Sequence, residues 1–312
     1  STRDWSSDVC SSDLHLQNRN PYFALVALCF LWGTTYLAIR IGVKSFPPFL
    51  FSGIRYVISG LLILIWFYLF RKEEIWPNWQ ELKRIIITGL FIFVGGNLFL
   101  VLAEQSVTSG MAALVNSSFP IWIVLITRIW NPEEKISNLS IVGILIGFVG
   151  QWLIFYEQLF MLSNGAYLLG FILLIVGLIN GSLGSVYMKK FPVSINSALN
   201  AGLQMMICGS ITTVIGLCMG EARKINFEPS GWYALFYLVI AGSILGYSLF
   251  VYAMDHLPAT IVSVYAYINP IVAIWLGLLL LKEPISFKTI VAIGVTLIGV
   301  FIVNLGRKRA TA

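Results

Sequence analysis

The chain of 312 residues is 58% hydrophobic and only 11% charged, and its mean hydropathy is +0.86. A soluble domain has about a quarter charged residues, so this composition excludes a soluble protein. Apolar runs of about 18 or more residues recur along the chain, and each is long enough to cross the roughly 30 Å hydrocarbon core of a bilayer. The net charge of +6 comes from short segments between these runs, so we expect contact with membrane lipid and no nucleic-acid partner.

The chain begins with a polar, serine-rich leader over residues 1–20. It lacks the charged start, apolar middle and small-residue cleavage site of a signal peptide. Residues 1–14 resemble a translated library adapter. We therefore expect the leader to be non-native or disordered and to lie outside the fold.

The apolar runs that follow predict an all-α membrane protein with ten transmembrane helices. The connections are short, and the longest places Trp76 and Trp79 among charged residues, which is typical of a segment at the membrane interface. We predict a first five-helix unit at 21–155, a second at 165–305 and a basic cytoplasmic tail at 306–312. The predicted spans are 22–42, 48–70, 84–105, 108–129, 138–155, 165–188, 197–219, 232–254, 258–280 and 285–305.

Two stretches of the chain repeat each other, and this repeat predicts how the ten helices are arranged. Residues 103–154 align with residues 253–303 at a shift of 150 residues, so that Pro120 falls on Pro270. Because five helices are an odd number, the second unit enters the membrane from the opposite side. The repeat therefore predicts two inverted five-helix units, a plan common among secondary transporters, whose substrate site lies near the bilayer midplane.

The distribution of basic residues predicts the orientation of the chain. With the N-terminus inside the cell, twelve lysines and arginines fall in inner segments and six in outer segments. Cytoplasmic segments carry the excess of positive charge. We therefore expect both termini to be cytoplasmic.

The sequence offers little material for catalysis at membrane depth. Paired carboxylates, metal-ligand spacing and a phosphate-binding loop are missing from the predicted spans, and a nucleophile needs a base and an orienting group. We expect no catalytic residue, no metal, no cofactor and no enzymatic activity. Asp255 and His256 at a membrane edge leave open a membrane-embedded enzyme or flippase acting on lipid intermediates. A non-transporting assembly partner is a third alternative, and a monomer and a homodimer both fit the sequence.

Polar and aromatic residues gather near the midpoints of six predicted spans, three in each half. Lipid offers such groups no partners, so we expect them to face the interior of the bundle. They can join helices by hydrogen bonds or line a substrate cavity, and their common depth in both halves favours the cavity. With no firm fixed charge among them, we predict a small neutral or zwitterionic substrate. The predicted substrate-binding residues are Trp32, Tyr36, Asn97, Asn116, Asn180, Tyr247, Tyr265 and Asn269.

Four further residues are candidates for a hinge or gate. Pro120 and Pro270 each remove a backbone hydrogen bond from a span, either as an ordinary kink or as a hinge that faces the substrate. Arg55 lies about 10 Å below the outer boundary of the second span, where an arginine needs a partner. Glu104 is within its reach, and the two could form a structural ion pair or an outer gate. Binding of a substrate carboxylate by Arg55 is a third option.

Several motifs resemble those of the EamA family of the drug/metabolite transporter superfamily. They are FLWGTTYLAIR in the first span, FSGIRYVISGLL in the second, and YINPIVAIWLGLLLLKEPIS in the ninth with its counterpart NSSFPIWIVLI in the fourth. The resemblance covers both halves, from about Tyr22 to Asn304. It implies two inverted five-helix units around a central cavity in the cytoplasmic membrane of a prokaryote, and the export of small metabolites, often amino acids. The family motif places a basic residue in the second span, matched by Arg55, and acidic residues after the fourth and ninth spans, matched by Glu134 and Glu283.

Overall fold

The computed structural model describes residues 20–71, 76–130, 137–157, 165–263, 265–282 and 286–310. Nearly all of the predicted leader lies outside these ranges, as do Glu134 and Glu283. Within them the regular structure is entirely helical, without a strand. The predicted all-α class is therefore confirmed.

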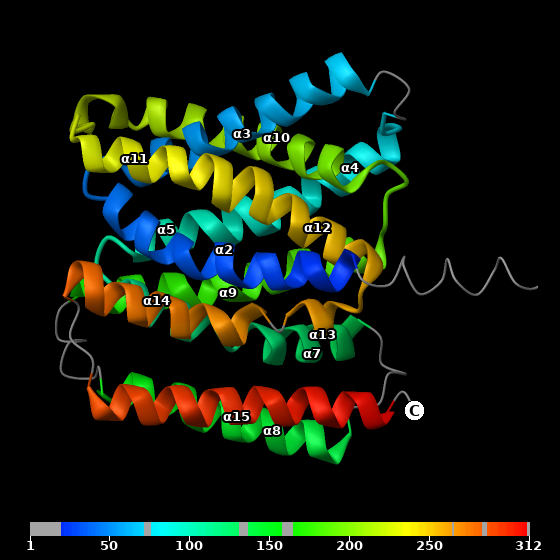
Figure 1. Ribbon diagram of the computed structural model, residues 1–312, viewed down its shortest axis with the longest axis vertical. Helices are drawn as coiled ribbons and strands as arrows, with labels where there is room; N and C mark the ends of the chain where they lie inside the picture. The colour runs from blue at the N-terminus through cyan, green and yellow to red at the C-terminus, as the bar shows by residue number, and fades with distance from the viewer. Residues whose placement is uncertain are drawn as a thin grey trace, which may run out of the picture.

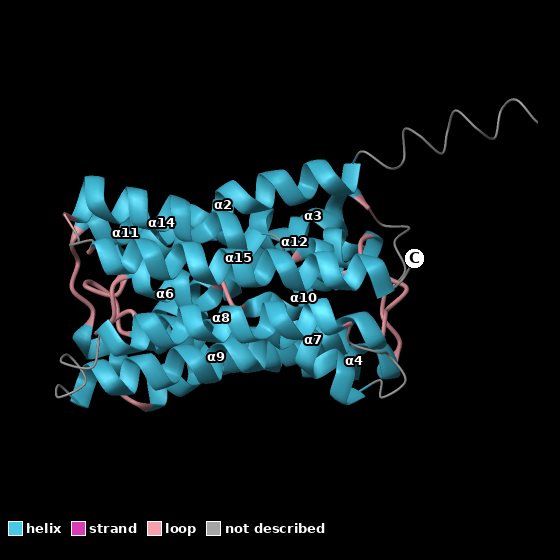
Figure 2. Ribbon diagram, turned by 90° about the horizontal axis from the view of Figure 1, so that it is seen from below, coloured by secondary structure: helices cyan, strands magenta, loops and turns pink. Residues whose placement is uncertain are grey.

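The helices form one bundle, whose long members run side by side in Figures 1 and 2. Seven helices of the described chain are long and apolar enough to cross a membrane, and three further apolar helical stretches are shorter. Their length and composition are consistent with a multi-pass membrane protein. The elements are α2 (Asn20–Gly42), α3 (Pro48–Phe70), α4 (Trp79–Gly89), η1 (Leu90–Asn97), α5 (Leu98–Ala103), α6 (Ser109–Asn116), α7 (Phe119–Trp130), α8 (Asn138–Glu157), α9 (Gly165–Lys190), α10 (Ser197–Cys218), η2 (Glu221–Lys224), α11 (Pro229–Tyr237), η3 (Leu238–Leu245), α12 (Gly246–His256), α13 (Ala259–Val262), α14 (Tyr265–Leu281) and α15 (Phe287–Ala310).

Two helix ends lie five residues from their predicted positions, at Trp79 and Ala310. The third span begins at Trp79 because Asn78 caps it: Asn78 Oδ1 accepts hydrogen bonds from the backbone N–H groups of Gln80 and Glu81, both at 3.0 Å. The Glu81 carboxylate accepts one from the backbone N–H of Asn78 at 3.1 Å, which completes a capping box. At the other end of the chain, α15 continues to Ala310, so the backbone of the predicted basic tail is helical as far as that residue.

Each half of the chain contains one π-helical segment, η1 and η3. The two segments begin 148 residues apart and each lies between two α-helices of one continuous span. A π-helix has wider turns than an α-helix, so it changes the direction of the side chains that follow, and such segments occur frequently at functional sites. Both segments border the cavity between the two halves.

Glycines bring two pairs of helices into close contact, α3 with α10 and α8 with α15. A Cβ atom at Gly60 of α3 would lie 2.6 Å from the backbone nitrogen of Met206, and one at Gly299 of α15 would lie 2.3 Å from that of Gly147. Small residues permit such an approach between helices in a membrane. The α3–α10 pair also packs on α4, α12 and η3, whereas α8 and α15 lie together at one edge of the bundle (Figure 1).

The fourth and ninth predicted spans are each interrupted, but their matched prolines occupy different places. Pro120 lies in the first turn of α7, which begins after a break at Ser117 and Ser118. A proline at this position removes no hydrogen bond, because the first N–H groups of a helix have no partner within it. Pro270 lies inside α14, where its missing N–H does interrupt the helical hydrogen bonds.

Candidate substrate site

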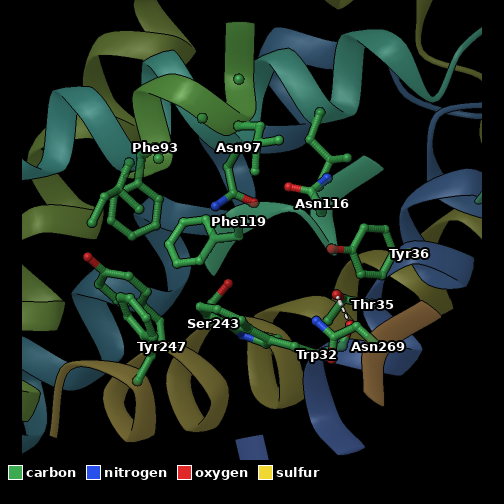
Figure 3. A pocket seen from close by; sticks show the side chains of 18 of the residues that line it. Trp32, Thr35, Tyr36, Phe93, Asn97, Asn116, Phe119, Ser243, Tyr247 and Asn269 are labelled. Carbon is green, nitrogen blue, oxygen red and sulfur yellow. Dashed lines mark hydrogen bonds between the residues drawn. The ribbon is translucent and has the colours of Figure 1, made fainter. Parts of the chain in front are cut away.

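A cavity of about 100 Å³ lies between the two halves of the chain (Figure 3). At roughly 10–15 Å³ for each water-sized group, it has room for about seven to ten such groups. The first half contributes α2, α3, η1, α5, α6 and α7, and the second contributes α9, η3, α12 and α14.

The structure brings seven of the eight predicted substrate-binding residues to this cavity. These seven are Trp32, Tyr36, Asn97, Asn116, Tyr247, Tyr265 and Asn269. The remaining one, Asn180, is not among the lining residues. Its side-chain amide donates to the backbone oxygen of Val176 at 2.8 Å, and its side chain packs on η1, where a Cβ atom at Gly95 would lie 2.8 Å from it. Asn180 thus takes part in helix packing, which was one of the two roles that the sequence allowed for these polar residues.

Aromatic rings form a wall of the cavity. The indole N–H of Trp32 donates to the backbone oxygen of Gly242 at 3.1 Å, which fixes the ring against η3. Its ring centroid lies 4.9 Å from that of Tyr265, edge to face, and 5.0 Å from that of Phe250. Such contacts between aromatic rings favour one arrangement of the side chains, so this wall is held in place before a substrate arrives.

Tyr247 presents its ring to the cavity and turns its hydroxyl towards α10. The hydroxyl donates to Oε1 of Gln204 at 2.6 Å, and Nε2 of Gln204 donates to Asn200 at 2.7 Å. Gln204 is fully buried. Any contact of Tyr247 with a substrate therefore depends on its ring, because its hydroxyl is engaged in a hydrogen bond between helices.

Arg55 lies at the cavity and not at the membrane surface. Only 4% of its surface is exposed, its Nε donates to Oγ of Ser243 at 2.7 Å, and its guanidinium carbon lies 5.0 Å from the ring centre of Tyr56. Gly242 leaves the space for it, since a Cβ atom there would lie 2.8 Å from Arg55 Nη2. The cavity therefore contains a positive charge, which corrects the expectation that it has no firm fixed charge.

The expected ion pair between Arg55 and Glu104 is not formed. Glu104 is fully buried just after the end of α5, and the guanidinium group of Arg40 donates to its backbone oxygen. The basic residue that approaches Glu104 thus comes from α2, whereas Arg55 is held by Ser243. The sequence could not indicate this choice, because Ser243 follows Arg55 by 188 residues.

Polar groups gather around Asn269. Figure 3 shows the Asn269 amide and the hydroxyl of Tyr36 close together on one side of the cavity, with Asn116 above them. Asn269 is 2% exposed, and its Oδ1 accepts no hydrogen bond from the described chain. The Asn116 amide donates to the backbone oxygen of Ala112 at 2.9 Å.

The sequence analysis missed several residues because their side chains are small or apolar, as are most residues around them in the same helices. Ser243 and the apolar rings of Phe93, Phe119 and Phe250 all line the cavity. A signal for Ser243 existed in the glycine pair Gly242 and Gly246, whose four-residue spacing is typical of close packing between membrane helices. Both glycines make room for cavity residues, Gly242 for Arg55 and Gly246 for Trp32.

The described residues contain no group of three or more histidines, cysteines or acidic residues that could hold a metal ion. A helical membrane bundle that encloses a polar and aromatic cavity between two halves is the architecture of a solute transporter.

Comparisons with known proteins assign the family. The sequence profile of the EamA-like transporter family matches the chain twice, at residues 19–156 and 168–305, and the chain belongs to this family. The inner membrane transporter YedA of Escherichia coli is 33% identical over 292 residues, which cover 92% of each chain. A transporter of Synechocystis is 26% identical over 296 residues, which cover 90% of this chain and 88% of its own. The family suggested by the sequence motifs is therefore confirmed.

A solved crystal structure has the same fold. It superimposes with a TM-score of 0.68, covers 93% of this chain and 98% of its own, and is 20% identical in sequence. The names of the relatives give a role in transport without a substrate, so the substrate must be inferred from the cavity itself.

Proposed function

We propose that the protein exports small zwitterionic metabolites such as amino acids across the cytoplasmic membrane of a prokaryote by alternating access. In this proposal the chain crosses the membrane ten times as two inverted five-helix units, and both termini are cytoplasmic. The observation that carries the proposal is the cavity between the halves, whose polar and aromatic lining includes seven residues predicted from their depth in the sequence.

Matched contacts at opposite ends of the bundle support the inverted arrangement. Near the start of α4, the backbone N–H and the hydroxyl of Ser194 both donate to Oε1 of Glu81, at 2.8 and 2.6 Å. At shifts of about 150 residues, the equivalent pair is Ser45 and Gly231 at the start of α11, and a Cβ atom at Gly231 would lie 2.3 Å from that of Ser45. Figure 1 places α4 and α11 at opposite ends of the bundle.

Polar contacts between the halves support alternating access, because each end of the cavity has contacts that can break. At one end, the guanidinium of Arg84 donates to the backbone oxygen of Pro192 at 3.0 Å, and the ammonium of Lys190 donates to that of Trp130 at 3.2 Å. At the other end, the Glu221 carboxylate accepts from the backbone N–H of Leu50 at 2.8 Å. Breaking one set at a time would open the cavity to one side of the membrane.

Counterflow into proteoliposomes tests the proposal. Vesicles loaded with a mixture of unlabelled amino acids should accumulate labelled amino acids faster than protein-free vesicles. Trp32→Ala should lower the rate about tenfold or more, because it removes the ring that packs on both Tyr265 and Phe250. The matched control is Trp152→Ala, whose side chain is 61% exposed on α8, and its rate should equal that of the wild type. Equal rates in vesicles with and without the wild-type protein would contradict the proposed function.

A lipid-handling enzyme or flippase has one specific observation in its favour. A surface groove of about 570 Å³ is lined by Tyr252 and His256 of α12 and by residues at the start of α10. The ring of His256 lies 2.8 Å from the backbone oxygen of Tyr252 through its Nδ1. Turnover or flipping of labelled lipid that is lost in His256→Ala, without amino-acid counterflow, would favour this alternative.

A further inference from the structure

The cavity has two chemically different ends. Arg55 and Ser243 lie at one, and Tyr36 and Asn269 lie at the other. Figure 3 shows Ser243 beside Tyr247, away from the pair formed by Tyr36 and Asn269. A substrate that satisfies both ends must itself carry two different polar groups.

The Arg55 end lacks a counter-charge. Its Nη1 is buried and has no hydrogen-bond partner within the described chain, and the described residues that line the cavity include no aspartate or glutamate. A buried cation requires compensation. The planar guanidinium fork fits a carboxylate through two parallel hydrogen bonds. Because Ser243 holds Nε and Tyr56 supports one face of the group, Arg55 is positioned for such a ligand.

The Asn269 end needs a donor. Asn269 Oδ1 is buried at 2% exposure and accepts no hydrogen bond from the described chain. The other side of the Asn269 amide interacts with the hydroxyl of Tyr36. Trp32 lies near Asn269 in Figure 3, and the ring of Tyr265 lies 4.9 Å from that of Trp32. An ammonium group donates several hydrogen bonds and is attracted to aromatic faces. This end therefore suits a cation better than a carboxylate.

We infer that the cavity binds a small zwitterion in one orientation, with its carboxylate on Arg55 and its ammonium group at Asn269. The inference rests on the proposed function and specifies its substrate class and the residues that recognise each group. Room for about seven to ten water-sized groups limits the ligand to a comparable number of non-hydrogen atoms, as in the smaller α-amino acids.

Counterflow of labelled L-alanine, with unlabelled competitors, tests each end separately. Lactate keeps the carboxylate and lacks the amine, and alaninamide keeps the amine and lacks the carboxylate. Each should compete with alanine at least tenfold more weakly in the wild type. Arg55→Gln should lower alanine counterflow at least tenfold and make alaninamide as good a competitor as alanine. Arg55→Lys should restore part of the counterflow, because it keeps the charge without the fork.

Asn269→Leu should act at the other end only. In this variant unlabelled lactate should compete with labelled alanine as strongly as unlabelled alanine does, while alaninamide should remain a weak competitor. Arg223→Gln is the matched control, since it removes the same charge from an exposed residue of η2 that does not line the cavity, and it should leave the order of competitors unchanged. A melting temperature within a few degrees of the wild type shows that each variant is folded.

The outcomes separate this inference from the proposed function. Wild-type counterflow of alanine that is undiminished in folded Arg55→Gln would overturn the inference and leave the proposed function in place. Counterflow of neutral solutes without a carboxylate, and none of alanine, would overturn it too. Absence of counterflow for every solute in the wild type would overturn the proposed function itself.

Discussion

Two pairs of helices in this protein pack through glycines in the same way, but only one pair contributes a side chain to the cavity. In both α3–α10 and α8–α15, glycines let two backbones approach within a distance that any Cβ atom would block. The α3–α10 pair carries buried polar groups: Arg55 reaches the cavity, and Gln204 accepts a hydrogen bond from Tyr247. None of the described residues of α8 and α15 lines the cavity.

The outer faces of α8 and α15 are apolar and exposed, as at Leu145 and Phe301, which suits contact with lipid. The comparison teaches that a glycine motif in a membrane helix reports close packing and says nothing of function. In the proposed function, the difference comes from the polar side chains of α3 that reach the cavity, whereas no described side chain of α8 or α15 does. Substitutions in the two pairs should therefore differ in what they disturb.

The largest combined effect on stability and transport is expected for Gly60→Leu in α3. The new side chain would collide with the backbone of α10 at Met206 and Gly202, and backbone atoms cannot move aside as a flexible side chain can. Overpacking costs about 1–3 kcal/mol or more, and it should also displace Arg55 in the same helix. We expect a lower melting temperature and loss of counterflow together. Gly294→Leu in α15 is the control, because a Cβ atom there has open space around it; a similar loss in that variant would contradict the explanation.

Gly299→Leu in α15 should produce the next largest effect, and of a different kind. It meets the backbone of α8 at Gly147 and Gly143, so the melting temperature should fall by a comparable amount. The cavity has no lining residue from this pair, so the folded fraction should keep the wild-type KM for counterflow. A raised KM with an unchanged melting temperature would show that α8–α15 takes part in substrate binding and would remove the distinction between the pairs.

Buried polar groups sharpen the comparison further. Gln204→Leu in α10 leaves the Tyr247 hydroxyl without its acceptor, and an unsatisfied buried group costs about 1–3 kcal/mol. Thr296 of α15 is also fully buried, but its hydroxyl has no hydrogen-bond partner in the described chain. Thr296→Val should therefore leave the melting temperature unchanged or raise it. An unchanged melting temperature in Gln204→Leu would indicate that the Tyr247–Gln204 hydrogen bond contributes nothing.

The sequence could reveal the depth of a residue in the membrane but not the side of the helix on which it lies. Depth follows from counting residues along an apolar run, because the bilayer fixes the length of a span. This is why residues such as Asn97 and Asn269 could be expected at one level. Asn180 lies at the same level but faces η1 across Gly95, and a rotation of the helix distinguishes it from the others.

The hydrogen-bond partners of charged side chains could not be predicted from the sequence for a related reason. Arg55 binds Ser243 on η3, and the π-helical turn determines the direction in which Ser243 points. Such a turn leaves no clear pattern in an apolar sequence, since the hydrophobic side chains of η3 suit an α-helix as well. Arg55 contacts Ser243, and not Glu104, because of how helices far apart in the sequence pack together. No local feature of the chain could predict this contact.

The smallest effect is expected on the outer face of the α8–α15 pair. The side chain of Leu145 is 61% exposed, and in the membrane it contacts lipid, which replaces the lost contacts when the residue is shortened. Leu145→Ala should change stability by no more than about 0.5 kcal/mol and leave counterflow intact. Leu114→Ala in α6, where the side chain is fully buried, should cost about 2–5 kcal/mol because it leaves a cavity. If Leu145→Ala were as damaging as Leu114→Ala, the outer face of α8 would have to contact protein in the membrane, and this pair would have a role beyond closing the edge of the bundle.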